Sequence, residues 1–562
     1  MATRSPQTPS SEDAGALSAL TQPGGAFEIR QEDVRGTVMS VFTSRMRTLR
    51  EVLDSTRRFG SRTYLVDGDT RLSYEEHLRS ADDLASALQS VFGVRKGDRV
   101  AIFAANRWEW VVCFWAIVAA GAIPCLMNGW WTAEEFGHAA AAVEPAVVFA
   151  DRERARRVAS SGVAVATVNL DEIPRLLGEH AGATPQLSQA QEDDPAVLIF
   201  TSGTTGKPKA AVLSHRSVIG FTQVNALLEI AAKVDFGMIP APTSWRELPP
   251  GDDVALVTIP LFHVSGLHGY AILTLVRGSA IVLLPGRFDP GRALRAIEKE
   301  RVTAWSPLGS LATRVAGYPE LANVDTSSLN SLRLGGAPVS PAVQEALRTA
   351  FPTAAKTLSV SYTSTEAGAV IATINGANCI AHPTSVGRVN PTLEVEIRDE
   401  TGRRVPDGHD GEVHVRSPYN MLGYWRDGDA SAAVLKENGW LAMGDIARIE
   451  DGLLYINSRA RDLILVNAEN VSPTEVEYVL EEHPDIGEAA VLAVDDEITG
   501  DAVCAVVVPR AGASLTADGL AGWCRPRLAY YKIPTRWQIE AAPLPRTASG
   551  KLLKHVLREK FN

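Results

Sequence analysis

The sequence is poor in cysteine. Its 562 residues include five cysteines, and no two of them form a CxxC pair. The five are Cys113, Cys125, Cys379, Cys504 and Cys524. Because the set is small, odd in number and scattered, it predicts neither a disulfide framework nor a structural zinc site. Such usage is typical of a reducing compartment, and we expect a cytoplasmic protein.

Positive charge is not in excess either. The chain has 55 Lys and Arg residues against 66 Asp and Glu residues, a formal net charge of −11. A generic electrostatic attraction to nucleic acid or anionic lipid is therefore excluded as the main mode of binding. Any polyanion must be held by a local arrangement of side chains.

Long uninterrupted hydrophobic runs are also missing. The one segment that approaches a membrane span, Trp110–Met127, contains Gly121 and Pro124. Its pattern predicts a buried helix and then a short strand. Residues 1–34 are rich in Ser, Thr, Gln, Pro and Gly and lack the features of a signal peptide, so we expect a flexible tail there.

Short apolar runs rich in β-branched residues are frequent, and several precede stretches with helical spacing. They lie at residues 146–150, 196–200, 254–259, 280–285 and 332–336. This alternation predicts the α/β class, with parallel sheets covered by helices.

The same patterns predict the domain organisation. We expect a large domain over residues 35–459, with a small β-rich subdomain where acidic glycine turns at 406–411 and 450–452 flank strand-like segments. From residue 460 to 562 the pattern becomes a compact α+β unit, with the boundary near Arg459–Asp462.

A run of hydroxyl, glycine and lysine residues, Thr201–Lys209, follows a buried strand directly. Glycines allow backbone N–H groups to approach phosphate oxygens, hydroxyls donate hydrogen bonds, and lysines neutralise charge. The run is not a Walker A loop, because Thr201 replaces the first glycine and Pro208 follows Lys207. By composition alone, polyphosphate binding and an ordinary turn both remain open.

Seven further motifs follow in a fixed order. They are Pro260–His263 with Gly266, Gly335–Pro338, Ser361–Glu366, Trp440–Asp445, Arg459–Asp462, Glu469–Pro473 and Pro545–Lys551. Together with Thr201–Lys209, they closely resemble the signature motifs of the adenylate-forming superfamily, which includes acyl-CoA synthetases, luciferases and peptide-synthetase adenylation domains. The resemblance covers roughly residues 40–562, and Asn128–Thr132 looks most like bacterial fatty-acyl-CoA ligases.

The resemblance implies activation of a hydrophobic carboxylic acid with ATP and Mg²⁺, followed by transfer of the acyl group to coenzyme A. Residues implied to bind the nucleotide are Thr201, Ser202, Gly203, Thr204, Thr205, Gly206, Lys209, Gly335, Gly336, Ala337, Ser361, Tyr362, Thr363, Asp445 and Arg459. Thr365 would hold the α-phosphate, and Glu366 with Thr204 would hold Mg²⁺. Lys551, Glu366, Thr365 and His263 would be catalytic.

The family also implies a moving small domain. Lys551 would be delivered for adenylation and then withdrawn, with Arg461 at the hinge and His263 as a gate beside the acyl carboxylate. The acyl pocket would include His263, Gly266, Thr363 and Ala367, with Tyr270, Trp305 and Ser310 as positional candidates.

Some positions depart from the family pattern. Asn467 and Ala468 replace two glycines before Glu469 and Asn470 in the implied coenzyme A tunnel, and Met443 replaces a threonine. An alternative is therefore an enzyme that only adenylates and passes its product to a carrier protein or a separate enzyme such as an acyltransferase. A binding protein without catalysis is disfavoured because Lys551 and Glu366 are present. A homodimer is the default expectation for such an enzyme.

Overall fold

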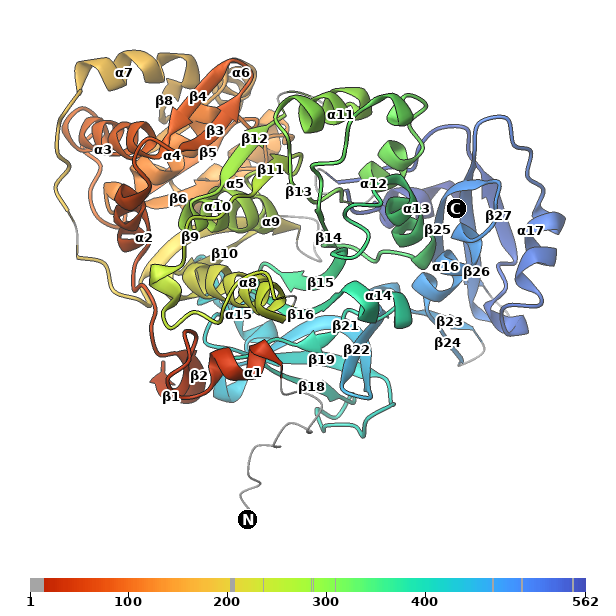
Figure 1. The fold of residues 1–562 in the computed structure, drawn as a ribbon. Coiled ribbons are helices and arrows are strands. Elements are labelled where there is room, and N and C mark those ends of the chain that lie inside the picture. Colours follow the sequence, from red (N-terminus) through yellow and green to blue (C-terminus); the bar gives the residue numbers. More distant parts are fainter. Residues whose placement is uncertain are drawn as a thin grey trace.

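The computed structural model describes residues 15–187, 189–202, 208–235, 237–284, 286, 288–308, 310–466, 469–496, 499–547 and 550–561. Within this part of the chain, two large sheets, a smaller β-rich sheet and a separate C-terminal α+β unit are arranged side by side (Figure 1). The predicted α/β class is confirmed.

The first large sheet has seven strands. Its order is β20 (Gly423–Tyr424), β10 (Pro208–Ser214), β9 (Pro195–Ser202), β6 (Ile123–Leu126), β5 (Arg99–Phe103), β7 (Val147–Ala150) and β8 (Ala166–Asn169). The pairs from β9 to β8 are parallel, whereas β10 and β20 run antiparallel at one edge. The predicted buried runs at 146–150 and 196–200 form β7 and β9.

The second large sheet has nine strands. Its order is β17 (Arg388–Val389), β16 (Ala369–Asn375), β15 (Ser359–Ser364), β14 (Ser331–Gly335), β13 (Ala304–Trp305), β11 (Val254–Val257), β12 (Ala280–Leu283), β3 (Thr63–Asp67) and β4 (Thr70–Ser73). Its central pairs are parallel. The other three apolar runs form β11, β12 and β14, as predicted.

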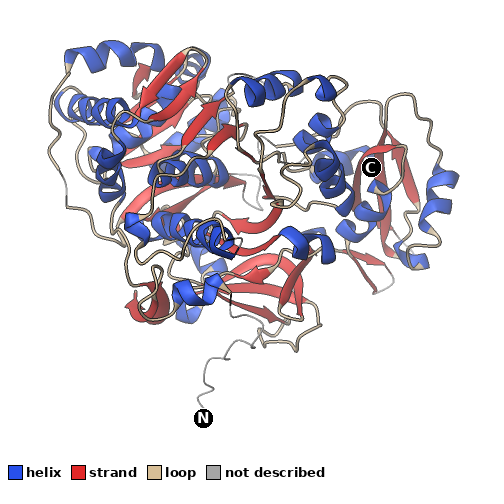
Figure 2. Ribbon diagram, in the orientation of Figure 1, coloured by secondary structure: helices blue, strands red, loops and turns tan. Residues whose placement is uncertain are grey.

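Helices cover these sheets, as Figure 2 shows. They are α2 (Leu49–Ser55), α3 (Tyr74–Ser90), α4 (Trp108–Ala119), α5 (Ala133–Val143), α6 (Arg152–Ser160), α7 (Ile173–Glu179), α8 (His215–Asp235), α9 (Val264–Gly266), α10 (Leu273–Arg277), α11 (Pro290–Lys299), α12 (Ser310–Ala316), α13 (Pro341–Ala350), α14 (Gly376–Ala381) and α15 (Gly428–Val434). Local sequence sets several helix starts. For example, Ser73 and Glu76 form a capping box at α3, and Thr132 and Glu135 form one at α5.

The segment from Trp110 to Met127 forms α4 and β6, as predicted, and nearly all of α4 is buried. In the described residues, none of the helices combines the length and the hydropathy needed to cross a bilayer.

The prediction of a flexible tail through residue 34 is wrong for the described residues 15–34. They form α1 (Ala16–Thr21) and β1 (Ile29–Val34), and β1 pairs with β2 (Thr37–Phe42). Leu20 and Phe27 are buried, and Phe27 stacks on Trp245. These two apolar side chains therefore fix the segment against the core.

The β-rich subdomain is a four-stranded antiparallel sheet: β18 (Glu394–Arg398), β19 (Gly411–Arg416), β21 (Trp440–Glu450) and β22 (Leu453–Arg459). The C-terminal unit contains β23 (Ile464–Val466), β24 (Glu469–Val471), β25 (Ile486–Asp496), β26 (Gly500–Pro509), β27 (Arg536–Ile539), α16 (Pro473–Glu481), α17 (Ala517–Cys524) and α18 (Lys554–Arg558). Its buried side chains form clusters of their own. A short turn, Ala460–Asp462, joins it to β22.

Candidate active site

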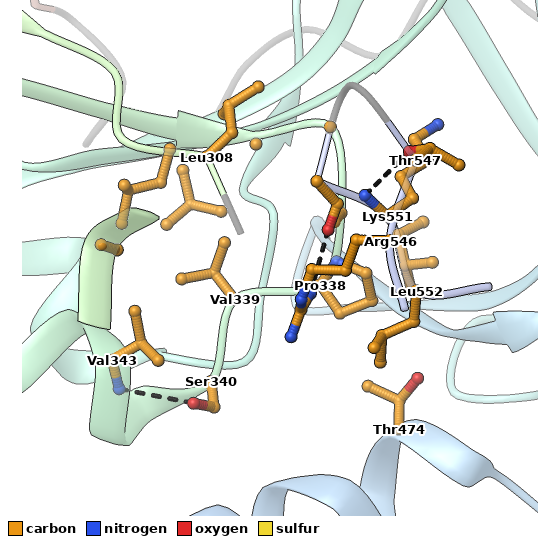
Figure 3. A pocket seen from close by; sticks show the side chains of 18 of the residues that line it. Leu308, Pro338, Val339, Ser340, Val343, Thr474, Arg546, Thr547, Lys551 and Leu552 are labelled. Carbon is orange, nitrogen blue, oxygen red and sulfur yellow. Dashed lines mark hydrogen bonds between the residues drawn. The ribbon is translucent and has the colours of Figure 1, made fainter. Parts of the chain in front are cut away.

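A cavity of about 2000 Å³ lies between the large domain and the C-terminal unit. Figure 3 shows Leu308 and Val339 on one side of it and Arg546, Lys551 and Leu552 on the other. The predicted site residues that line it are Thr201, Lys209, His263, Gly335, Gly336, Ala337, Ser361, Tyr362, Thr363, Thr365, Glu366, Asp445, Arg459, Arg461 and Lys551. Motifs that are up to 350 residues apart are thus brought to one place.

The carboxyl end of β14 forms a flat part of the wall. Gly335 pairs with Ser361 of β15, and a Cβ atom at Gly335 would lie 2.5 Å from the Ser361 carbonyl oxygen. Gly336 has a φ of +74°, a conformation that favours glycine. The close approach of β14 and β15 thus requires glycine at residue 335, whereas a Cβ atom at Gly336 would have only Leu308 Cδ1 within 4 Å, at 3.9 Å.

Asp445 is the buried carboxylate of the site. Its Oδ2 atom accepts a hydrogen bond from the Tyr362 hydroxyl, and its Oδ1 atom lies 3.5 Å from Arg459 Nε. Asp445 and Arg459 are register partners on β21 and β22. Burial raises the pKa of Asp445, although the Arg459 charge opposes this shift. Each carboxylate oxygen keeps a lone pair, so the group can still accept hydrogen bonds from ligand hydroxyls.

Glu366 is held by two hydroxyl groups. Ser364 Oγ donates to its Oε2 atom at 3.0 Å, and the Tyr424 hydroxyl donates to its Oε1 atom at 3.2 Å. Among the described residues, no three His, Cys, Asp or Glu side chains form a metal-binding group. Mg²⁺ often uses one or two carboxylates and substrate phosphates, so Glu366 fits a metal that arrives with a nucleotide.

The phosphate-loop motif is described only at its two ends. Thr201, on β9, pairs with Lys209 on β10. Lys209 Nζ lies 5.6 Å from the centre of the Tyr424 ring and 3.9 Å from Asp427 Oδ2. The predictions for Gly203, Thr204, Thr205 and Gly206 lie outside the described residues, as does the side chain of Ser202.

Lys551 enters the cavity from the C-terminal unit. Arg546 stabilises the segment that carries Lys551. Its guanidinium donates hydrogen bonds to Glu488 Oε2 and to the Gly550 carbonyl oxygen, both at 2.9 Å. The Lys551 N–H donates to Thr547 Oγ1 at 3.1 Å. The Lys551 side chain is surrounded by protein yet open to the cavity, and this desolvation lowers its pKa. The Glu366 and Asp445 charges act in the opposite direction.

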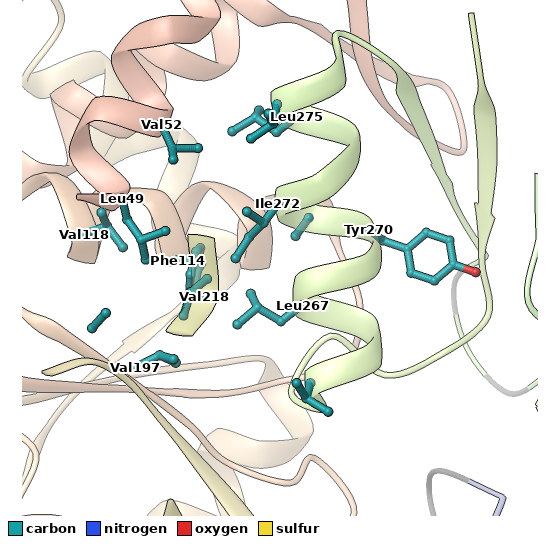
Figure 4. Close-up of a cluster of buried hydrophobic side chains, with 14 of the residues drawn as sticks. Leu49, Val52, Phe114, Val118, Val197, Val218, Leu267, Tyr270, Ile272 and Leu275 are labelled. Carbon is teal, nitrogen blue, oxygen red and sulfur yellow. The ribbon is translucent and has the colours of Figure 1, made fainter. Parts of the chain in front are cut away.

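His263 faces the same cavity as a neutral imidazole. Burial, together with the Lys551 charge, lowers its pKa to about 4, and its Nε2 atom is buried without a hydrogen-bond partner. The helix that follows is fixed by the core. In Figure 4, Leu267 and Ile272 point into a cluster of buried apolar side chains, whereas Tyr270 points the other way.

The structure does not place four other predicted residues on the cavity wall. Ala367 is buried in the core, and a Cβ atom at Gly266 would lie 2.1 Å from the Pro260 carbonyl oxygen, so both are tightly packed behind the wall residues. Glu469 and Asn470 are exposed on β24, away from the cavity. Asn467 and Ala468 lie outside the described residues.

Two positional candidates are likewise absent from the wall. Tyr270 and Trp305 are buried, and Trp305 Nε1 donates to Thr258 Oγ1 at 3.0 Å. The side chain of Ser310 lies outside the described part of the chain.

Sequence reasoning missed several residues of the site. Tyr424 contacts both Glu366 and Lys209, but its position depends on the pairing of β20 with β10, which no local pattern indicates. It also missed an apolar part of the wall formed by α12, α13 and the segments that precede them, which includes Leu308, Ala312, Ala316, Val339, Val343 and Ala346.

Comparison with known proteins gives matches over most of the chain. Residues 52–425 match the family model of the AMP-binding enzyme, and residues 475–551 match that of the AMP-binding enzyme C-terminal domain. The chain is 34% identical to a feruloyl-CoA synthase from Amycolatopsis sp over 500 residues, which is 89% of this chain and 96% of the relative.

It is 33% identical to the indoleacetate–CoA ligase of Aromatoleum aromaticum, with 87% of this chain and 93% of the relative covered. Among solved structures, it is similar to the amide bond synthetase McbA from Marinactinospora thermotolerans. That similarity has a TM-score of 0.77 and 31% identity, and covers 91% of this chain and 100% of the other.

Proposed function

Because the chain belongs to the AMP-binding enzyme family, we propose that it activates an aromatic carboxylic acid with ATP and transfers the acyl group to coenzyme A. Its enzyme class is acid–thiol ligase, that of the feruloyl- and indoleacetate-activating relatives. The observation that carries the proposal is the meeting of Lys551 with Glu366, Asp445 and Arg459 in one interdomain cavity.

In the first half-reaction, an oxygen of the substrate carboxylate attacks the α-phosphorus of ATP, and pyrophosphate leaves with the electron pair of the broken P–O bond. Lys551 would stabilise the charge that develops where the two substrates meet. Asp445 would accept hydrogen bonds from the ribose, and Lys209 and Thr201 would bind the leaving phosphates. Mg²⁺ on Glu366 would neutralise phosphate charge.

In the second half-reaction, the thiol sulfur of coenzyme A attacks the acyl carbon, its proton is lost, and AMP leaves. His263 lines the cavity and is neutral at pH 7, and we propose it as the gate beside the acyl carboxylate. Lys551 must first withdraw, and we propose Arg461 in the Ala460–Asp462 turn as the hinge.

The resemblance implied a hydrophobic carboxylic acid without identifying it, and we propose an aromatic one. The relatives above act, by name, on ferulate and indoleacetate. Val264 and Ser265, which come directly after His263, carry no charge, and neither do the described wall residues between 307 and 316. An uncharged part of the wall suits an uncharged aromatic ring.

The test measures acid-dependent formation of AMP from ATP across hydroxycinnamic, arylacetic and fatty acids, with and without coenzyme A, with products identified by mass spectrometry. We expect the aromatic acids to give acyl-CoA and AMP at the highest kcat/KM. Turnover of fatty acids alone would overturn the substrate class. Absence of acid-dependent exchange of pyrophosphate into ATP with every acid would overturn the activity.

A second candidate is adenylation with transfer to another acceptor. Its support is the 31% identity to an amide bond synthetase and the presence of Asn467 and Ala468 where the family pattern has glycines. In the same assay, acyl-AMP that persists in the presence of coenzyme A would favour this candidate over the ligase.

A further inference from the structure

Tyr424 lies between two oppositely charged groups of the nucleotide site. Its hydroxyl donates to Glu366 Oε1 at 3.2 Å, and the face of its ring lies 5.6 Å from Lys209 Nζ. The Thr201 side chain also lies near the Tyr424 hydroxyl. One side chain therefore contacts the end of β9, the start of β10 and the carboxylate that follows β15.

The backbone around Tyr424 is fastened on both sides. Leu422 and Trp425 donate their N–H groups to the carbonyl oxygens of Val212 and Ala210 on β10, each at 2.8 Å. The Tyr424 N–H donates to Ser431 Oγ at 2.8 Å, and the N–H of Met421 donates to the carbonyl oxygen of Glu366 at 2.8 Å. These hydrogen bonds fix the backbone position of Tyr424 relative to Glu366 and to strand β10.

We propose that Tyr424 is a positioning residue that keeps the Glu366 carboxylate and the Lys209 ammonium apart and aims each at the metal-bound phosphates of the nucleotide. This inference rests on the proposed ATP-dependent function. Without the ring between them, the two opposite charges would be free to pair with each other, and neither would then be available to the ligand.

The chemistry of tyrosine suits this role. Burial and the neighbouring Glu366 charge raise the pKa of Tyr424 well above its ordinary value, so the hydroxyl stays a donor to the carboxylate. The ring face attracts a cation and offers it no competing negative charge. The carboxylate is oriented from its other side by Ser364.

The test uses binding of a non-hydrolysable ATP analogue, measured by calorimetry with and without Mg²⁺, which needs no acid substrate. Tyr424→Phe removes the hydroxyl and keeps the ring. We expect the increase in affinity that Mg²⁺ gives to fall roughly tenfold, the range for a lost hydrogen bond to a charged group, with Mg²⁺-free binding unchanged. Tyr424→Leu also removes the ring, and we expect it to weaken binding with and without the metal.

The matched control is Tyr455→Phe, because the Tyr455 hydroxyl lies 3.4 Å from His382 Nδ1 and is outside the cavity wall. Thermal unfolding of each variant reports whether the fold is retained. Equal Mg²⁺ enhancement in Tyr424→Phe and the wild type would overturn the positioning role. Failure of acid-dependent pyrophosphate exchange in the wild type would overturn the proposed function separately, since it leaves the nucleotide-binding comparison intact.

Discussion

Lys551 illustrates how a single side chain gains its role from the domain that carries it. Its segment is held by Arg546, whose guanidinium bonds Glu488 within the same unit. The ammonium group meets Glu366, Asp445 and Arg459 only across the domain boundary. Its contribution to rate should therefore be separable from its contribution to folding.

At this scale we predict that Lys551→Ala lowers adenylation by roughly 10²–10³-fold, the effect of losing one preorganised donor at a developing charge. Transfer of a supplied acyl-adenylate to coenzyme A should change far less. Pyrophosphate exchange measures the first step, and acyl-CoA formation from synthetic acyl-AMP measures the second. Lys560→Ala, which removes only an ion pair with Glu540, is the control. Equal losses in both steps would contradict the assignment.

Site residues could be predicted from the sequence where they lie in a continuous motif. The distances between site residues, and the residues placed only by strand pairing, could not. Glu366, Asp445 and Lys551 were identified because each stands in a recognisable run, and all three line the cavity. Tyr424 was not, because its contacts depend on the pairing of β20 with β10 some 210 residues earlier in the chain. Gly266 was assigned to the acyl pocket by resemblance, and its close approach to the Pro260 backbone could not be predicted from the motif.

Among the elements, strands were more predictable than segments with mixed composition. The β-branched runs form β7, β9, β11, β12 and β14 because buried parallel strands tolerate few other residues. The segment 15–34 was predicted as a tail because residues 1–34 as a whole are rich in Ser, Thr, Gln, Pro and Gly. Leu20 and Phe27 nevertheless fix it against the core, which an average over the segment cannot detect.

The end of β14 gives a prediction at the scale of an element. In Gly335→Ala the new methyl group would meet the Ser361 carbonyl oxygen at 2.5 Å, so β14 and β15 must separate where they form the proposed adenine wall. We expect binding of the ATP analogue to weaken by roughly tenfold, within the range for overpacking by 1–3 kcal/mol.

Gly178→Ala in α7 is the control for Gly335→Ala, because nothing lies within 4 Å of an added Cβ atom there. Calorimetry measures affinity, and thermal unfolding measures the accompanying loss of stability. Unchanged nucleotide affinity in Gly335→Ala would show that this strand end does not form the adenine wall.

At the scale of the whole molecule, the contact between the two domains includes a titratable group, the Glu481 carboxyl. Glu481 ends α16 and lies near Ser340, the N-cap of α13 in the large domain. Burial raises its pKa from 4.5 to about 7, and the nearby Glu477 and Glu488 charges add to the shift while Arg546 opposes it. Tyr478 shares this environment, and Lys554 pairs with Glu477.

The sign of the effect follows from the raised pKa. The part of this burial that the large domain supplies favours the protonated carboxyl when the domains are docked. The stability of docking is therefore highest below pH 4.5, declines as pH rises toward 7 and changes little above it. The docking equilibrium can shift by up to about tenfold per pH unit in that range. We predict that the population with Lys551 in the cavity falls between pH 5 and 7.5 in the wild type, and that Glu481→Gln, which stays neutral, removes most of this dependence.

Energy transfer between dyes on two engineered surface cysteines, one in each domain, measures the population, since all five native cysteines are buried. Glu475→Gln is the control, because that glutamate pairs with Lys532 away from the contact. The same pH slope in Glu481→Gln and the wild type would assign the dependence to another group.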